Sequence, residues 1–256
     1  MILNTAIKFK ILHSTTHLLS LFGVIWILIT GNYQWLIPSL IMFLYAGIFG
    51  INISLHRYYS HRSFKTGKLR DLFLLFSSFF PMVGSPAMWS SLHVYHHIHS
   101  DTDKDPHSPN RSNKFKIWFA LWPPVNIPLS IFRRFVRDKK MMFLHKHYFL
   151  LVTCYALLLL AIDWRLLVFV FAIPAVGCFH GASAIAVIPH LTLWGSYRTH
   201  NTNDSSRNSI IAWIFSLGEG WHNNHHNNPR NYRSGEKWWE IDHSAFIIKH
   251  FLKTNK

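Results

Sequence analysis

The chain has 256 residues, of which 50% are apolar and only 14% carry a formal charge. Soluble domains usually carry roughly 25% charged residues, so this composition favours contact with lipid. Two cysteines are too few for a disulfide framework or for a cysteine-based zinc or iron–sulfur site. The formal net charge of +15 could indicate nucleic-acid binding, but membrane proteins also collect Lys and Arg on their cytoplasmic side.

Four apolar blocks are long enough to cross a bilayer, which takes roughly 20 apolar residues each. They cover about residues 13–30, 35–55, 143–162 and 166–189. The connector within each pair is too short for a domain, so we predict two transmembrane helical hairpins. No small-residue cleavage site follows the first block, which is therefore expected to be a retained anchor.

The predicted fold is an all-α integral membrane protein with four transmembrane helices and a helical cap. The cap is expected to comprise residues 56–142 and 190–256, in a single domain over residues 1–256. Every Lys and Arg lies before, between or after the two hairpins, except Arg165 in the second connector and Lys146 at the start of the third block. The positive-inside rule therefore predicts that both termini and the cap face the cytoplasm, and the charge gives little support to a nucleic-acid partner.

Two stretches within the predicted cap are apolar but interrupted. Residues 69–92 contain Asp71 and two prolines, and a single crossing there would put the histidines on either side of it on opposite membrane faces. We predict an amphipathic helix along the membrane surface instead. Residues 117–132 contain Trp122-Pro123-Pro124 and Pro128, which break a helix.

Eight of the 19 histidines form three clusters at or after the predicted membrane helices. The clusters are His56 and His61; His93, His96 and His97; and His222, His225 and His226. The H-x-x-H-H spacing of the second and third places three imidazoles on one face of a helix. His56 and His61 are five residues apart, so both reach a shared centre only if the helix ends or bends between them.

A lone histidine is usually a surface or packing residue, but two H-x-x-H-H runs on one membrane face are harder to explain that way. One structural zinc site takes four ligands and would leave histidines over. Magnesium or calcium would require oxygen ligands, and no acidic residue lies within the clusters. Spacing alone therefore predicts a polynuclear site of a transition metal such as iron, zinc, copper or nickel.

Several motifs resemble those of the membrane fatty acid desaturases. They are Leu55-His-Arg-Tyr-Tyr-Ser-His-Arg-Ser-Phe64, Trp89-Ser-Ser-Leu-His-Val-Tyr-His-His97, Asp103-Lys-Asp-Pro-His107 and Gly218-Glu-Gly-Trp-His-Asn-Asn-His-His226. The resemblance is greatest to the acyl-CoA (stearoyl-CoA, delta-9-like) desaturase branch in its bacterial form, and it covers about residues 35–245.

The resemblance implies two iron ions bound by nine histidines, eight of which are those of the clusters. His190 matches the ninth, with His180 as the fallback, while the asparagine that the family places nearby is Ala186 here. Outer partners that orient the ligands are expected at His107, Asp105 and Glu219, and Asp101 is a further candidate.

The resemblance also implies an activity, partners and a location. The enzyme would introduce a cis double bond into a saturated acyl chain, with O₂ as co-substrate and two electrons from a separate cytoplasmic donor such as a ferredoxin, a rubredoxin or a b-type cytochrome. A bacterial inner membrane is the expected location. An Arg-Asp pair that helps acyl-CoA enzymes recognise coenzyme A is replaced by Ser91 and Leu92, so a phospholipid or a carrier protein is an alternative head group.

Two other functions remain open from the sequence. Membrane hydroxylases and ketolases of lipids or hydrocarbons also use histidine clusters, and would insert oxygen instead of removing hydrogen. A non-catalytic metal-binding relative is the second alternative, which the replacement at Ala186 favours.

Overall fold

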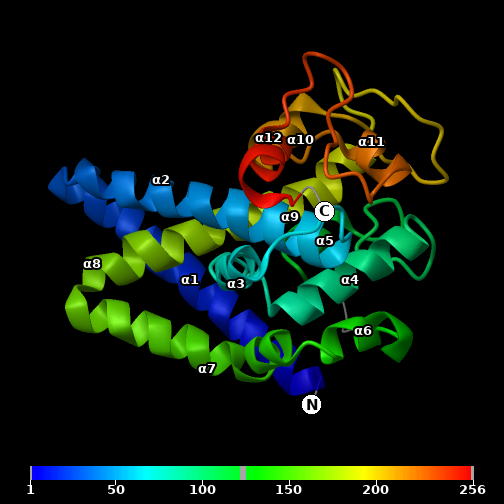
Figure 1. The fold of residues 1–256 in the computed structure, drawn as a ribbon. Helices are drawn as coiled ribbons and strands as arrows, with labels where there is room; N and C mark the ends of the chain where they lie inside the picture. Colours follow the sequence, from blue (N-terminus) through cyan, green and yellow to red (C-terminus); the bar gives the residue numbers. More distant parts are fainter. Residues whose placement is uncertain (1, 122–124, 255–256) are drawn as a thin grey trace.

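The computed structural model describes residues 2–121 and 125–254. Four long helical segments dominate it (Figure 1). They are α1 (Ile2–Thr30); η1, α2 and η2 (Tyr33–Trp35, Leu36–Tyr45 and Ala46–Ser60); α7 (Lys139–Ile162); and α8, η3, α9 and η4 (Trp164–Leu166, Leu167–Ala172, Ile173–Val187 and Ile188–His190). Four spans within them are long and apolar enough to cross a membrane, namely Thr5–Thr30, Tyr33–Ser60, Lys139–Ile162 and Trp164–His190.

The four helices form the two predicted hairpins. Figure 1 shows both hairpin connections at one end of the bundle, and both termini with the cap at the other end. Large apolar side chains on the outer surface are exposed, for example Leu28 (67%) and Ile29 (78%) on α1 and Leu150 (61%) on α7. An apolar surface of this kind indicates contact with lipid.

The structure extends two of the predicted helices. The first candidate span begins at Thr5 and not near residue 13, because Lys8 and Lys10 lie within the helix and do not end it. The second span continues to Ser60 and so carries His56 inside the helix. Hydropathy predicts helix ends poorly at the membrane surface, because polar residues there can continue a helix into the cap.

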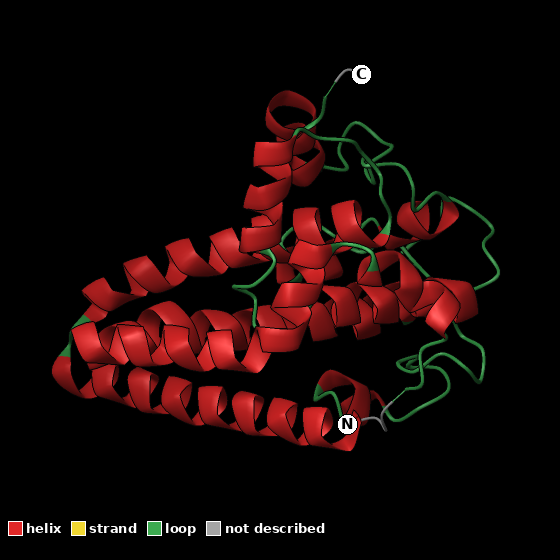
Figure 2. Ribbon diagram, turned by 60° about the horizontal axis from the view of Figure 1, so that its bottom comes forward, coloured by secondary structure: helices red, strands yellow, loops and turns green. Residues whose placement is uncertain are grey.

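The cap is also helical, and Figure 2 shows no strand in the chain as drawn. Among the described residues only isolated bridges pair Tyr197 with Asn208 and Asn208 with Trp221. The cap helices are α3 (Lys68–Ser77), α4 (Pro86–His99), α5 (Lys114–Trp118), α6 (Leu129–Val136), α10 (Ile210–Phe215), α11 (His222–Asn227), α12 (His243–Ile247) and η5 (Ile248–Leu252). The prediction of an all-α fold with four candidate membrane helices is confirmed.

The single surface helix predicted over residues 69–92 is wrong, because the segment forms two helices, α3 and α4. The turn between them packs against η2 at Gly50, where an added Cβ would lie 2.5 Å from Pro81 and 2.8 Å from the Ser77 carbonyl. Of these two helices, α3 exposes more apolar side chains, with Leu69 82% and Phe76 61% exposed. The sequence also predicts that prolines interrupt any helix over residues 117–132. Pro128 directly precedes α6, and Trp122-Pro123-Pro124 lie outside the described residues.

Candidate metal centre

The first histidine cluster lies where η2 ends. The Ser60 side chain donates to the carbonyl of Leu55, and His61 N–H donates to the carbonyl of His56 at 3.1 Å, so both hydrogen bonds span five residues. This wider π-type winding gives more residues per turn than an α-helix, and such turns are frequent at functional sites. The two rings consequently lie together, with centroids 5.0 Å apart. The helix therefore ends at Ser60, between the two histidines, as expected from the sequence.

The second and third clusters lie on short helices held in place by backbone contacts. The second is on α4, which begins at Pro86, and the third is on α11. Gly220 permits the approach to α11, because an added Cβ would lie 2.3 Å from both the Ser209 carbonyl and the Trp213 nitrogen.

The two asparagines between the histidines of the third cluster hold α11 from its other side. Asn223 Oδ1 accepts hydrogen bonds from Thr199 N and His200 N, each at 2.8 Å. Asn224 Nδ2 donates to Glu240 Oε2 at 2.8 Å.

The structure gathers all nine histidines implied by the resemblance into two adjacent groups. The five-histidine group comprises His56, His61, His93, His97 and His225, and the four-histidine group comprises His96, His190, His222 and His226. Within each group the possible ligand atoms all lie within 4.8 Å of one another. The groups are side by side, since the ring centroids of His97 and His226 are 4.3 Å apart.

Carboxylates hold three of these rings from behind. Glu219 Oε2 lies 3.0 Å from His56 Nδ1, and both oxygens of Asp105 lie 3.0 Å from His96 Nδ1. Asp204 Oδ2 lies 2.6 Å from His226 Nδ1. Each pair leaves Nε2 to face the interior of its group, which is how histidines that ligate metals are usually oriented.

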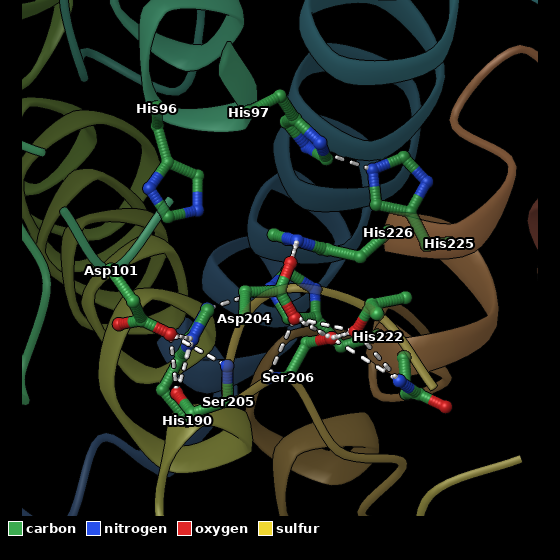
Figure 3. Close-up of polar contacts among 12 residues, drawn as sticks. His96, His97, Asp101, His190, Asp204, Ser205, Ser206, His222, His225 and His226 are labelled. Atoms are coloured by element: carbon green, nitrogen blue, oxygen red, sulfur yellow. Dashed lines mark hydrogen bonds and ion pairs between the residues drawn. The ribbon is translucent and has the colours of Figure 1, made fainter. Parts of the chain in front are cut away.

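The ninth histidine is held in the same way through a serine (Figure 3). His190 Nδ1 lies 3.2 Å from Ser205 Oγ and 3.5 Å from Asp101 Oδ2. The Ser205 hydroxyl donates to that same Asp101 oxygen at 2.6 Å. The structure thus places Asp101, Asp105 and Glu219 beside three different rings, as outer partners would be.

The electrostatics favour the neutral form of five of the nine rings and the ionised form of two acidic partners. Burial, and then the neighbouring histidines, hold the pKa well below its usual value for His61, His93, His97, His222 and His225. Burial opposes ionisation of Glu219 and Asp105, but Arg57 and His56 for the first and His96 for the second lower each pKa to about 2. Neutral imidazole is the form that binds metal.

Two of the remaining predicted residues lie in different places. His107 stacks on His96, with ring centroids 4.4 Å apart, and its Nδ1 is 3.9 Å from Asp105 Oδ1. His180, the fallback ligand, is in neither histidine group of the described residues. Its Nδ1 accepts a hydrogen bond from Trp118, and its Nε2 faces His17 Nε2 at 3.2 Å. The geometry therefore favours His190 over His180.

Sequence patterns missed three polar residues at this centre. Asp204 and Ser205 lie in a polar stretch where nothing distinguishes them from surface residues. Arg57 is 2% exposed, and its guanidinium donates to Glu219 Oε1 and to Asp242 Oδ1, each at 2.8 Å. In the sequence, only its position next to His56 indicates that Arg57 has a role at the metal centre.

The arrangement of ring nitrogens fits bound metal ions. In the five-histidine group, Nε2 of His56 lies 2.9 Å from Nε2 of His225, and Nε2 of His61 lies 2.8 Å from that of His93. His226 Nε2 is buried and has no hydrogen-bond partner among the described residues. A buried lone pair costs free energy unless something pairs with it, and a metal ion would pair with several at once.

A narrow apolar cavity of about 50 Å³ ends at this centre. Its membrane portion is lined by Phe43 and Gly47 from α2 and η2, and by Gly177 and Ala182 from α9. His56, His93 and His222 line its other end, so it reaches both histidine groups. An apolar lining with a few polar groups at one end is typical of a site that takes a small molecule.

Comparison with known proteins agrees with this arrangement. The sequence pattern of the fatty acid desaturase family matches residues 33–253. The sn-1 stearoyl-lipid 9-desaturase of Anabaena variabilis is 31% identical over 86% of this chain and 82% of its own length. Delta-9 acyl-lipid desaturase 1 of Arabidopsis thaliana is 35% identical over 85% of this chain and 73% of its own. The acyl-CoA C20 delta-5 desaturase of Anemone leveillei is 34% identical over 80% and 68%.

The family match covers every one of the nine grouped histidines. The first two proteins named are, by their names, desaturases that act at position 9 of lipid-linked chains. With its four candidate membrane helices and its histidine groups, the chain belongs to the fatty acid desaturase family and is an oxidoreductase.

Proposed function

We propose that this chain introduces a cis double bond at position 9 of a saturated acyl chain linked to a lipid, at two iron ions bound by the nine grouped histidines. One observation carries the proposal: an apolar cavity between the membrane helices ends at both histidine groups. A chain of CH₂ groups is the ligand that such a lining would take, since its only favourable interaction with the cavity is burial away from water.

The ligand assignment follows the two groups. One iron would be held by the five-histidine group and the other by the four-histidine group. Imidazole suits iron, although it also suits zinc and copper, so the choice of iron comes from the family resemblance and not from geometry.

Removal of hydrogen from CH₂ groups is beyond the acid–base chemistry of side chains, and iron with O₂ would supply the oxidising power when bound. The residues of this chain perform the other tasks. Gly47, Gly177 and Ala182 leave room for the acyl chain, and the apolar walls exclude water. Glu219, Asp105, Asp204 and Asp101 hold the rings at fixed orientations. These residues thereby keep one C–C bond near both metal positions. Positioning the substrate in this way lowers the entropy cost of reaching the transition state.

A lipid head group is favoured over coenzyme A by α4. Ser91 is fully buried, and its hydroxyl donates to the carbonyl of Ala87 within the same helix. It therefore offers no contact to a head group at the position where acyl-CoA enzymes are expected to carry a charged pair. The names of the two position-9 relatives, both lipid desaturases, point the same way.

The two electrons would come from a separate protein. The cysteines are free, with Cys154 exposed on α7 and Cys178 buried on α9, so they do not form a cysteine-bound electron-transfer site. A ferredoxin, a rubredoxin or a b-type cytochrome is the proposed donor. The location in a bacterial inner membrane stays a prediction of the sequence.

We expect both termini and the cap on the cytoplasmic side, because the cap holds most of the Lys and Arg. A reporter enzyme that is active only in the cytoplasm, fused to either terminus, should be active in both fusions. The same reporter inserted at residues 31–32, in the first hairpin connection, should be inactive. An active insertion there would contradict the orientation.

Blocking the cavity should reduce turnover without removing metal. Ala182→Phe places a ring in the membrane portion of the cavity, and we expect the rate of desaturation to fall about 10-fold or more, because small displacements of a substrate are costly. The iron content should stay at the wild-type value. Leu158→Phe, at a lipid-facing position 58% exposed on α7, is the matched control. Equal activity in both variants would show that the acyl chain does not occupy this cavity.

The proposed function is tested by expression in a host that lacks the activity, followed by mass-spectrometric mapping of double bonds in its lipids. The expected product is a position-9 alkene on lipid-linked chains. An alcohol or a ketone without a new alkene would overturn the proposal in favour of a hydroxylase.

A further inference from the structure

The two histidine groups differ in the negative charge that surrounds them. In the four-histidine group, His96, His190 and His226 each have a carboxylate oxygen within 3.5 Å of Nδ1. In the five-histidine group, among the residues that the structure describes, only His56 has a carboxylate within salt-bridge distance, that of Glu219. The group with fewer imidazoles therefore has three anions around it, and the group with more has one.

The single carboxylate of the five-histidine group is also paired with an arginine. Glu219 Oε1 accepts hydrogen bonds from Arg57 Nη2 at 2.8 Å and from Arg57 Nε at 3.1 Å. Both side chains are almost fully buried, so the positive charge acts close to the metal position without screening by water. Asp242 shares the same guanidinium, on the side away from Glu219.

Among the described residues, no lysine or arginine side chain pairs with the carboxylates of the three aspartates in the same way. Within the described part of the chain, the ion pairs of Asp101, Asp105 and Asp204 are all with histidines. Arg111 and Arg198 approach two of these residues, but they donate to the backbone carbonyls of Asp101 and Asp204 and not to the carboxylates. The carboxylates are instead held by hydroxyls and backbone N–H groups, which orient them without removing their charge.

Figure 3 shows Asp101 and Asp204 next to rings of the four-histidine group. A carboxylate behind a ligating imidazole raises the electron density of that ligand, and its charge favours the more positive metal ion. Three such carboxylates on one side of a metal pair, against one that is paired with an arginine, make the two positions electrostatically unequal.

We propose that the two iron positions differ in reduction potential, and that the iron in the four-histidine group is the one that is oxidised first and holds the ferric state. The proposal rests on the two-iron site of the proposed function. The step is a transfer of one electron from the diferrous pair to a one-electron oxidant such as ferricyanide, which becomes ferrocyanide. It leaves one Fe³⁺ and one Fe²⁺ and moves no atom or proton.

The test uses full-length protein loaded with ⁵⁷Fe, reduced with dithionite and titrated with ferricyanide in the presence of mediators. Mössbauer and EPR spectra follow the two oxidation states. We expect a form with one ferric iron to accumulate, with two potentials at least 59 mV apart, which is a tenfold ratio for one electron. Two indistinguishable potentials in wild-type protein that holds two irons would overturn the proposal.

Variants assign the ferric ion to its position. Asp204→Asn keeps an acceptor for His226 Nδ1 but removes a charge. The first reduction potential should therefore rise by about 59 mV, a tenfold change in equilibrium constant for one electron, and the second potential should rise by less. Glu219→Gln should move mainly the second potential. Asp103→Asn, at a residue whose side chain is 90% exposed, makes the same charge change in solvent and should move neither.

A first potential that moves no further in Asp204→Asn than in Asp103→Asn, or that moves most in Glu219→Gln, would contradict the assignment. If Asp204→Asn loses iron, Asp101→Asn gives the same comparison through His190. Failure of the two-iron site itself is separate, because it would appear as an iron content below two per wild-type chain.

Discussion

Replacing His225 with alanine should abolish desaturation. His225 Nε2 lies 2.9 Å from Nε2 of His56 and 3.1 Å from that of His97, near the middle of the five-histidine group. Its removal takes one ligand from the proposed metal and leaves the facing rings without their partner. Loss of an outer partner of a metal ligand already costs about 10–100-fold, so we expect the loss of a ligand to exceed about 100-fold. Double-bond mapping in lipids of the expression host measures the activity.

Iron content separates this effect from misfolding. The purified His225→Ala protein should hold fewer than two irons and should remain in the membrane fraction at the wild-type level. His250→Ala is the matched control, because His250 is exposed and lies outside both histidine groups of the described residues. A His225→Ala protein with full iron content and normal activity would remove His225 from the ligand set.

Replacing Arg57 with methionine should destabilise the fold more than any other single change considered. Arg57 donates to Glu219, to Asp242 and to the carbonyl of Tyr232, and it joins η2 to the third cluster and to the start of α12. Its loss leaves two buried carboxylates without a cation. Breaking a buried ion pair in this way costs about 3–5 kcal/mol in free energy of unfolding.

Thermal unfolding in detergent measures this loss, because the melting temperature falls by about 2–4 °C for each kcal/mol in a chain of this size class. Arg62→Met is the control, because Arg62 is exposed and lies five residues further along the same segment. We expect it to change stability by less than about 0.5 kcal/mol, as surface substitutions usually do. Equal melting temperatures for the two variants would show that the Arg57 network does not stabilise the protein.

The helical hairpins and the gathering of the histidine clusters could be predicted because each depends on local information. A membrane helix is recognisable from a run of apolar residues, and H-x-x-H-H on a helix places its rings together through the winding of the backbone alone. The same information predicted Asp105 and Glu219 as partners, since both lie within motifs next to the clusters they hold. Helix ends were less predictable, as the extension of η2 to Ser60 shows.

Other features depend on contacts between residues far apart in the chain. The split between α3 and α4 depends on the close approach of Pro81 to Gly50, and the role of Asp204 depends on a loop that folds back on α11. The choice of His190 over His180 depends on which turn of α9 and η4 faces α11, where His190 Nε2 lies 3.2 Å from His222 Nε2.

The sequence by itself determined that this protein has four membrane helices and three histidine clusters on one side of them, because apolar length and helical spacing act within short segments. Only the tertiary structure decided how nine imidazoles divide into groups of five and four. It also decided that three aspartates, which pair with histidines alone among the described residues, surround one group, while the acid at the other group pairs with Arg57. Charges act through space over several ångströms, so their balance at a site follows from the fold and cannot be read from neighbours in the chain.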